Sequence, residues 1–194
     1  MSNILSVADE KIYTSEIVIN KSRFLCFVKH IVDAQDAENF LCEKREAYKD
    51  ARHICYAYRL QNSGKLSDDG EPSGTAGMPI MEVLEKQGLF DIIAVVVRYF
   101  GGVKLGAGGL LRAYTGAVTE CLKTAKKVLW EQAKIYHKSM EYKQYKTFLN
   151  SIKNRKIRIL NTEFDMGAEV RFVAAATEEI ADACEVGDVL FAFD

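Results

Sequence analysis

The sequence predicts an α+β protein with two domains, residues 1–130 and 131–194. The first observation is an apolar segment, residues 91–100, that leads through a glycine-rich turn into an amphipathic segment. This order is typical of a buried strand followed by a helix. The second observation is the change of apolar spacing along residues 134–193, which predicts the ferredoxin-like order β-α-β-β-α-β. Trp130 marks the expected domain boundary.

The first domain is expected to hold five elements before its long apolar segment: a hairpin, a helix, a strand, a polar loop and a second helix. Alternating apolar residues on both sides of Asn20 and Lys21 predict the hairpin. Asp33 is placed to cap the first helix, and Gly88 stops the second. In chain order the five elements cover residues 12–29, 33–48, 53–60, 61–77 and 79–87.

Residues 92–97 form a continuous apolar run in which every residue except Ala94 is β-branched. This composition suits a strand that is covered on both faces, so we expect it to be central in its sheet. Five glycines follow, and we expect positive φ angles at some of them because glycine lacks a Cβ atom. They are Gly101, Gly102, Gly106, Gly108 and Gly109.

The glycine-rich turn leads into the start of a helix, where unpaired N–H groups and the positive end of the helix dipole can hold an anion. Arg98, Tyr99 and Phe100 precede the turn and Arg112 follows it. Together with the glycines, they are candidate anion-binding or partner-binding residues. The alternative is a tight structural turn. The sequence completes neither the GxxxxGK[ST] nor the GxGxxG nucleotide-binding pattern.

The polar loop contains three acids, Asp68, Asp69 and Glu71, beside Gly70. Long loops in compact domains are often functional, and three carboxylates could hold Mg²⁺ or act as a general base, although the calcium-loop pattern fails. Alternatively, these carboxylates stabilise the loop by accepting hydrogen bonds from backbone N–H groups or from an arginine. We expect Arg98 to reach toward this loop.

Charge is unevenly distributed in the second domain, although the whole chain has a formal net charge of −1. Residues 134–158 contain eight Lys or Arg and one acid, whereas residues 159–194 contain nine acids and one arginine. Such asymmetry steers a polyanion to one end of a domain. The candidate nucleic-acid-binding residues are Lys143, Lys146, Lys153, Arg155, Lys156 and Arg158. The alternative is a solvated helix face. Because no base-reading motif is present, RNA contact would be to backbone and shape.

Four segments resemble the IMPACT/YigZ family. They are RYFGGVKLG (98–106), SDDGEPSGTAG (67–77), ARHICYAYR (51–59) and KSRF (21–24). The resemblance implies that the first domain is similar to the second domain of a small-subunit ribosomal protein and to domain IV of elongation factor G, with a left-handed β-α-β crossover. It also implies that the ferredoxin-like second domain is similar to domain V of that factor. Both similarities point to translation.

Three functions fit these patterns. We favour a non-enzymatic, translation-associated regulator that contacts RNA, the ribosome or a translation factor through the glycine turn and the basic segment. The second is an enzyme that acts on a small phosphorylated substrate. The third is a protein–protein regulatory module with Tyr99, Phe100 and Tyr114 as aromatic anchors. No nucleophile–base pair stands out in the sequence, so no catalytic residue is assigned.

Several classes of protein are disfavoured by the sequence. The spacing of cysteines and histidines is not typical of a metal site, so neither a metal nor another cofactor is expected. No apolar run reaches the roughly 18 residues of a membrane span, and the N-terminal residues lack the features of a secretion signal. We therefore expect a cytoplasmic protein that does not bind membranes. The sequence does not indicate the oligomeric state.

Overall fold

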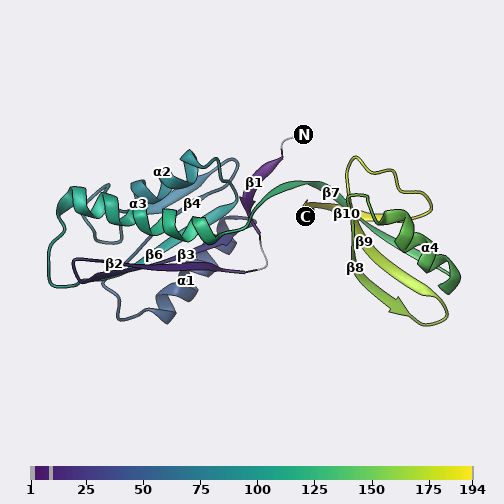
Figure 1. The fold of residues 1–194 in the computed structure, drawn as a ribbon, viewed down its shortest axis with the longest axis horizontal. Helices are drawn as coiled ribbons and strands as arrows, with labels where there is room; N and C mark the ends of the chain where they lie inside the picture. The colour runs from purple at the N-terminus through teal and green to yellow at the C-terminus, as the bar shows by residue number, and fades with distance from the viewer. Residues whose placement is uncertain (1–2, 9–10, 194) are drawn as a thin grey trace. The chain divides into compact units, whose positions relative to one another are not determined.

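The computed structural model describes residues 3–8 and 11–193. The chain divides into two compact units, Leu5–Lys127 and Val128–Asp194, the latter taken together with Met1–Ile4. Helices and strands are mixed, and the strands form two sheets (Figure 1). The α+β class predicted from the sequence is therefore confirmed.

The first unit contains a five-stranded antiparallel sheet with the order β2-β3-β6-β4-β5. Three helices of this unit, α1 to α3, pack on the sheet. In the described part of the chain, no helix is long and apolar enough to cross a membrane. The bounds are β2 Tyr13–Ile19, β3 Ser22–His30, α1 Ala34–Ala47, β4 His53–Arg59, β5 Gly64–Ser67, α2 Gly77–Lys86, β6 Ile92–Tyr99 and α3 Gly106–Thr124.

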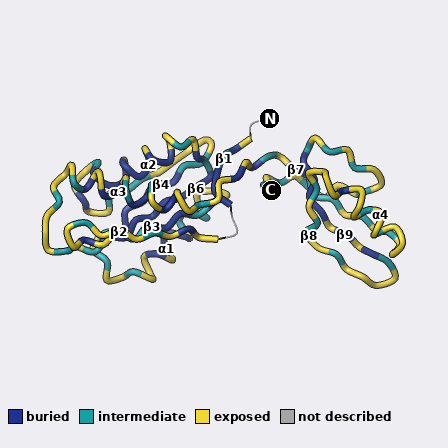
Figure 2. The backbone as a smooth tube through the Cα atoms, in the orientation of Figure 1, coloured by how far each residue is buried: buried dark blue, intermediate teal, exposed yellow. Residues whose placement is uncertain are grey.

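Strand β6 lies in the middle of this sheet, between β3 and β4, which confirms the predicted central strand. Residues 92–97 are completely buried, as Figure 2 shows along β6. Ile92, Ala94 and Val96 join a core with α2 and α3, whereas the alternate side chains join a core with α1. The helices accordingly cover both faces of the sheet (Figure 1). Both faces of β6 must therefore be apolar, which explains its continuous apolar run.

Local sequence determines the turn of the first hairpin and the start of the first helix. Asn20 and Lys21, which connect β2 to β3, have φ angles of 46° and 64°, as a tight two-residue hairpin turn requires. The Asp33 side chain accepts a hydrogen bond of 2.7 Å from the N–H of Asp36 and so caps α1. The hairpin and the helix cap are both confirmed.

The segment predicted as a polar loop, residues 61–77, contains a short strand. Its first part forms β5, which pairs with β4 at the edge of the sheet. An edge strand needs little apolar content, so the polar sequence Gly-Lys-Leu-Ser gave no strand signal. Helix α2 also begins at Gly77, two residues before the predicted start at Pro79.

The second unit contains an antiparallel sheet in which β9 lies between β7 and β8, and β10 also pairs with β7. Helix α4 packs on this sheet through Tyr145 and Phe148, which contact a core that includes Phe172. The bounds are β7 Lys127–Met140, α4 Tyr142–Ile152, β8 Ile157–Phe164, β9 Ala168–Ala175 and β10 Cys184–Ala192. The short strand β1 covers Ile4–Val7, most of which belongs to the first unit.

The second helix of the predicted order β-α-β-β-α-β, expected from Thr177 to Gly187, does not form, so this unit has the order β-α-β-β-β from Lys127 onward. Residues 184–192 instead pair with β7, with an irregularity in the ladder near Gly187. The carboxylate of Glu178 accepts hydrogen bonds from Arg155 and from the backbone N–H of Lys156. The residues that the predicted helix would have contained are instead bonded in these contacts and in the pairing of β10 with β7.

Candidate ligand-binding pocket

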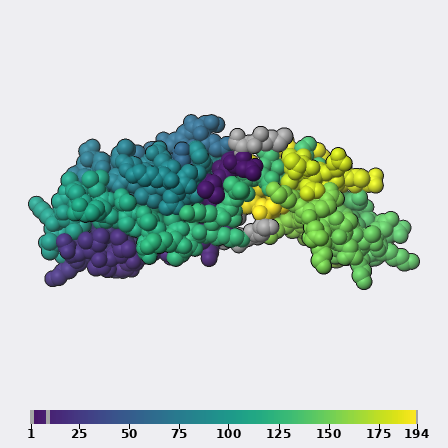
Figure 3. Space-filling model, turned by 45° about the horizontal axis from the view of Figure 1, so that its top comes forward, coloured from purple at the N-terminus to yellow at the C-terminus, as the bar shows by residue number. Residues whose placement is uncertain are grey.

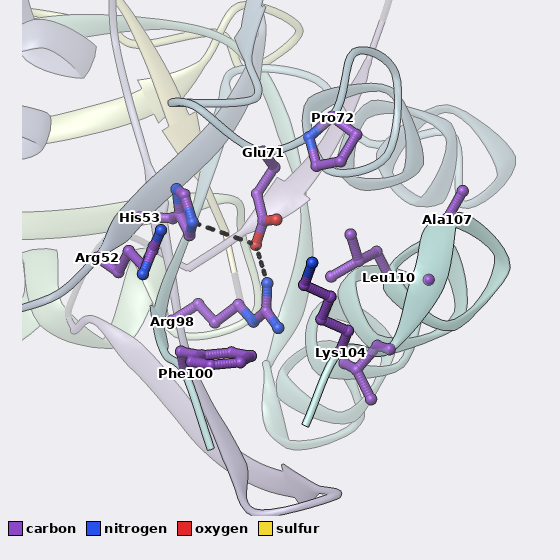
Figure 4. Close-up of a pocket in the computed structure, with 11 residues that line it drawn as sticks. Arg52, His53, Glu71, Pro72, Arg98, Phe100, Lys104, Ala107 and Leu110 are labelled. Atoms are coloured by element: carbon purple, nitrogen blue, oxygen red, sulfur yellow. Dashed lines mark hydrogen bonds and ion pairs between the residues drawn. The ribbon is translucent and has the colours of Figure 1, made fainter. Parts of the chain in front are cut away.

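A pocket of about 450 Å³ opens where β6 ends and α3 begins. Its wall combines the start of β4, the acidic loop, the end of β6, the glycine turn and the first turn of α3 (Figure 4). Segments that are far apart in the sequence therefore meet at one site. The lining residues are Arg52, His53, Glu71, Pro72, Arg98, Phe100, Lys104, Leu105, Gly106, Ala107 and Leu110.

A buried ion pair forms the back of the pocket. Arg98 Nη1 donates to Glu71 Oε1 over 2.5 Å, and the two side chains are only 6% and 3% exposed. Tyr114, from α3, donates its hydroxyl hydrogen to the same Glu71 oxygen over 2.9 Å. The prediction that Arg98 reaches the acidic loop is confirmed, and its partner there is Glu71. This pair joins β6 and α3 to the loop.

Cys55 and Tyr114 extend this network into the core. The Cys55 thiol lies 3.0 Å from the carbonyl oxygen of Asp68 and 3.3 Å from the Tyr114 hydroxyl. Burial raises the pKa of both groups well above their usual values, helped by the negative charge of Glu71. Both therefore stay neutral and act as hydrogen-bond donors. Tyr114 is completely buried, so it is not the exposed aromatic anchor that the protein–protein hypothesis would use.

His53 faces the ion pair from β4, where it is the register partner of Arg98. Its Nδ1 lies 2.8 Å from the carbonyl oxygen of Asp69, so Nδ1 carries a hydrogen and donates it. Nε2 then lies 4.0 Å from Glu71 Oε1, beyond hydrogen-bond distance. Figure 4 shows His53 and Arg98 approaching Glu71 from different directions.

The other two acids of the loop, Asp68 and Asp69, accept hydrogen bonds from backbone N–H groups. Asp68 accepts hydrogen bonds from the N–H groups of Gly74, Ala76 and Gly77 at 2.8 to 2.9 Å. It thereby satisfies donors at the start of α2, which has no cap from its own Ala76 side chain. Burial alone would raise the pKa of Asp68, but these three hydrogen bonds outweigh it and the pKa is lowered. Asp69 accepts from the N–H of Ile54 over 2.6 Å.

These contacts favour the loop-stabilising interpretation of Asp68 and Asp69. Gly70, with a φ angle of 81°, and Asp69, at 41°, shape the tight turn that brings the carboxylates to the backbone. Among residues 3–8 and 11–193, no three His, Cys, Asp or Glu side chains are grouped as metal ligands would be. Glu71, the acid that lines the pocket, is bonded through Oε1 to Arg98 and Tyr114.

Cationic and aromatic groups face the pocket instead. The Arg98 guanidinium lies 5.3 Å from the Phe24 ring and 5.7 Å from the Phe100 ring. Its buried Nε has no hydrogen-bond partner in the described part of the chain. Phe100 is 42% exposed, and Arg52 lies 6.0 Å from the same ring. In Figure 4 the amine of Lys104 also points into the pocket.

The first turn of α3 supplies the opposite wall. Its N-cap residue, Leu105, provides no side-chain hydrogen bond, and Gly106 and Ala107 line the pocket. The N–H groups of a first helical turn have no partner inside the helix and carry the positive end of its dipole. This helix is 19 residues long. The structure therefore brings a helix start, Arg98, Arg52 and Lys104 together around one cavity.

Several predicted residues lie outside this cavity. Tyr99 donates its hydroxyl hydrogen to Asp50 over 2.9 Å, and Arg112 lies exposed on α3. Of the five glycines of the turn, only Gly102 and Gly106 have positive φ, at 85° and 68°. That prediction is confirmed at these two positions.

The predicted nucleic-acid-binding residues of the second unit fall into two groups. Lys143, Lys146 and Lys153 lie exposed on α4 or at its end, and none forms an ion pair within the described residues. The other three contact neighbouring side chains. Arg155 forms an ion pair with Glu178 and Lys156 forms one with Glu131, whereas the Arg158 guanidinium lies over the Phe191 ring.

Sequence reasoning missed Arg52, His53 and Lys104 as parts of the pocket. His53 is the register partner of Arg98, and this contact between β4 and β6 depends on the strand order of the sheet, for which the local sequence carries no signal. Lys104 lies inside the glycine-rich turn and was passed over in favour of its glycines.

Comparison with known proteins places these features in a family. The model of the Impact N-terminal domain matches residues 20–122. The IMPACT family member YvyE of Bacillus subtilis is 42% identical over 87% of this chain and 78% of its own length. YigZ of Escherichia coli is 44% identical over 54% of each chain. A crystal structure of a hypothetical protein matches with a TM-score of 0.65 and 33% identity, over 91% of this chain and 87% of that chain.

Replacing Asp68 by Asn should destabilise the first unit by about 1–3 kcal/mol at pH 7, because an amide cannot accept from all three N–H groups as a carboxylate does. The folded pKa of Asp68 is lowered, so the stability it contributes is present above its unfolded pKa of about 3.9 and is lost as pH falls through the folded value. The difference between parent and variant should therefore shrink below about pH 4.

Calorimetric unfolding at pH 7 and pH 3 measures this. Replacing the exposed Asp165 by Asn removes the same charge from a side chain that forms no hydrogen bond within the described residues, and should have little effect at either pH. An Asp68→Asn variant as stable as the parent at pH 7 would contradict the capping role.

Alanine substitutions at the glycines of the turn should differ in their effect on stability. A Cβ atom at Gly101 would lie 2.0 Å from the backbone carbon of Lys21, so Gly101→Ala should prevent correct packing of the turn. At Gly102 and Gly106 there is open space but positive φ, so each substitution should cost about 1 kcal/mol. At Gly108, a helical position with ordinary contacts, alanine should stabilise by about 0.5–1 kcal/mol. Thermal unfolding gives the ranking, and equal effects at positions 101 and 108 would refute it.

Proposed function

Because the chain belongs to the IMPACT family, we propose that it is a non-enzymatic, translation-associated regulator that contacts ribosomal RNA in the cytoplasm. The observation that carries this proposal is the unpaired lysine face of α4. The motif resemblance supports the link to translation, and the charge of α4 supports the contact with RNA. A translation factor bound to the ribosome is a further partner compatible with this role.

The lysine face consists of Lys143, Lys146 and Lys153. Spacings of three and seven residues place the three on one side of the helix, because 3.6 residues make one turn. On the opposite side of α4, Phe148 packs on the core and Ile152 is buried. Packing therefore fixes the helix while the lysine face points to solvent. In the space-filling view, the green atoms of this part of the chain form part of the outer surface (Figure 3).

A groove beside the lysine face adds polar groups to this surface. It has a volume of about 530 Å³ and is lined by Lys138 and Lys143, by the polar residues Gln144, Thr147 and Ser151, and by one acid, Asp182. Hydroxyl, amide and ammonium groups suit phosphate and 2′-hydroxyl groups and read no particular base. The groove supports a contact with RNA backbone and shape.

The non-enzymatic part of the proposal rests on what the acids of the first unit do. Asp68 and Asp69 accept hydrogen bonds from the backbone. Glu71 accepts from Arg98 and Tyr114. A general base or a metal ligand needs a lone pair that is free to meet the substrate or the ion. Each acid that the enzyme hypothesis would use is thus bonded to the fold through at least one of its carboxylate oxygens.

Replacing Lys143, Lys146 and Lys153 together by Gln should weaken binding to single-stranded RNA of every sequence. For three phosphate contacts, the slope of log affinity against log salt should become flatter by about 2, at roughly 0.7 for each phosphate. Thermal stability should hardly change, because all three side chains are exposed. Fluorescence anisotropy with mixed-sequence RNA and cosedimentation with ribosomes, both over a salt series, measure the effect.

A matched control replaces three exposed lysines of the first unit, Lys49, Lys86 and Lys123, by Gln. The net charge changes by the same amount, and each of these lysines loses only an exposed ion pair of small energy. If the α4 variant and this control weaken binding equally, the effect is one of total charge and the proposed contact is wrong. It is equally wrong if the α4 variant binds RNA and ribosomes as the parent does.

A further inference from the structure

We propose that the pocket between β6 and α3 binds a nucleoside monophosphate, with the base stacked on Phe100 and the phosphate held at the start of α3. This inference goes beyond the proposed function, since it concerns the first unit and does not depend on the lysine face of α4. Four features of the pocket support it: its charge, the incomplete bonding of Arg98, the start of α3 and the exposure of Phe100.

The charge of the pocket favours an anion. Arg52, Arg98 and Lys104 line it against a single acid, Glu71. Because Glu71 is paired with Arg98, the positive charges of Arg52 and Lys104 have no counterpart in the lining. A volume of about 450 Å³ falls within the range that small-molecule sites occupy.

Arg98 is a buried cation whose hydrogen-bonding capacity is only partly used. Its side chain is 6% exposed and donates from Nη1 to Glu71, but Nε has no acceptor in the described part of the chain. Buried donors are nearly always bonded, and one that is not calls for an explanation. Guanidinium groups bind phosphate oxygens through two parallel N–H donors. A phosphate in this pocket would supply the missing acceptor after a small adjustment of the Arg98 side chain.

The start of α3 provides the second part of the phosphate site. Leu105 caps the helix without a side-chain hydrogen bond, and the following Gly106 and Ala107 line the pocket. A phosphate there would accept from first-turn N–H groups and meet the positive end of the helix dipole. Lys104, whose amine points into the pocket in Figure 4, lies beside this position.

Phe100 provides a platform for the base. It is 42% exposed, although it directly follows the buried central strand. Arg52 and Arg98 lie 6.0 and 5.7 Å from its ring. Nucleobases stack on exposed aromatic rings and on arginine planes, and this stacking tolerates any base. An aromatic platform beside a phosphate site matches the two ends of a nucleotide.

The same chemistry occurs in a free nucleotide and at the 5′ end of an RNA chain. Titrations should therefore use adenosine 5′-monophosphate, adenosine, inorganic phosphate, and one short RNA with and without a 5′-phosphate. We expect the monophosphate to shift the amide NMR signals of residues 106–108 and to bind at least 10-fold more tightly than adenosine. Tighter binding of the 5′-phosphorylated RNA than of the free nucleotide would support the site and assign it to RNA ends. Binding of the nucleotide alone would support the site and assign it to free nucleotides.

Three variants test the assigned contacts. Ala107→Glu places a carboxylate at the helix start, where it should not lower the melting temperature but should weaken nucleotide binding at least 10-fold by repelling the phosphate. Phe100→Leu should weaken binding at least about 5-fold through loss of stacking. Lys104→Gln should weaken it and reduce its salt dependence. Lys123→Gln, an exposed lysine at the other end of α3, is the control and should bind as the parent does.

The inference is overturned if adenosine 5′-monophosphate does not bind at millimolar concentration. It is also overturned if it binds equally to the parent, Ala107→Glu and Phe100→Leu. Neither result depends on whether the lysine face of α4 contacts RNA, so this inference and the proposed function can fail separately.

Discussion

The buried pair of Arg98 and Glu71 is the interaction on which the first unit depends. Removing two charges from water costs several kcal/mol for each ion, and their attraction offsets this only when further hydrogen bonds complete the geometry. Tyr114 supplies one of these bonds to Glu71, and the Phe24 and Phe100 rings lie beside the Arg98 guanidinium. The pair therefore fixes the central strand, the acidic loop and α3 to one another. The back wall of the pocket follows from this constraint.

The acidic loop illustrates how a charged segment becomes part of the fold. Asp68 binds the N–H groups before α2, Asp69 binds β4, and Glu71 binds β6 through Arg98. Each carboxylate thus bonds to a different part of the first unit. The loop therefore contributes more to the rigidity of the pocket than to its charge. The free charges of the pocket are the cations Arg52 and Lys104. The site is consequently suited to an anion, although the neighbouring sequence is rich in acids.

Features encoded by local sequence could be predicted, whereas features created by tertiary contacts could not. The apolar run of β6, the turn at Asn20 and the Asp33 cap each have a short-range signal. β5 is a polar edge strand with no such signal, and the segment after Thr177 forms no helix because its residues bond to the start of β8 and to β7.

The same distinction applies to the pocket. Arg98 was identified as a site residue because it stands beside the glycine turn, and its partner lies in the loop that the sequence indicated. Which acid pairs with it depends on the path of the folded loop, which sequence spacing does not reveal. A double-mutant cycle with Arg98→Met and Glu71→Gln tests the central claim most directly. The readout is the rate of hydrogen exchange at the backbone amides of β6, which exchange only when that sheet unfolds. We predict that each single change costs about 3–5 kcal/mol and that the double change costs much less than their sum. Additive effects would contradict the account.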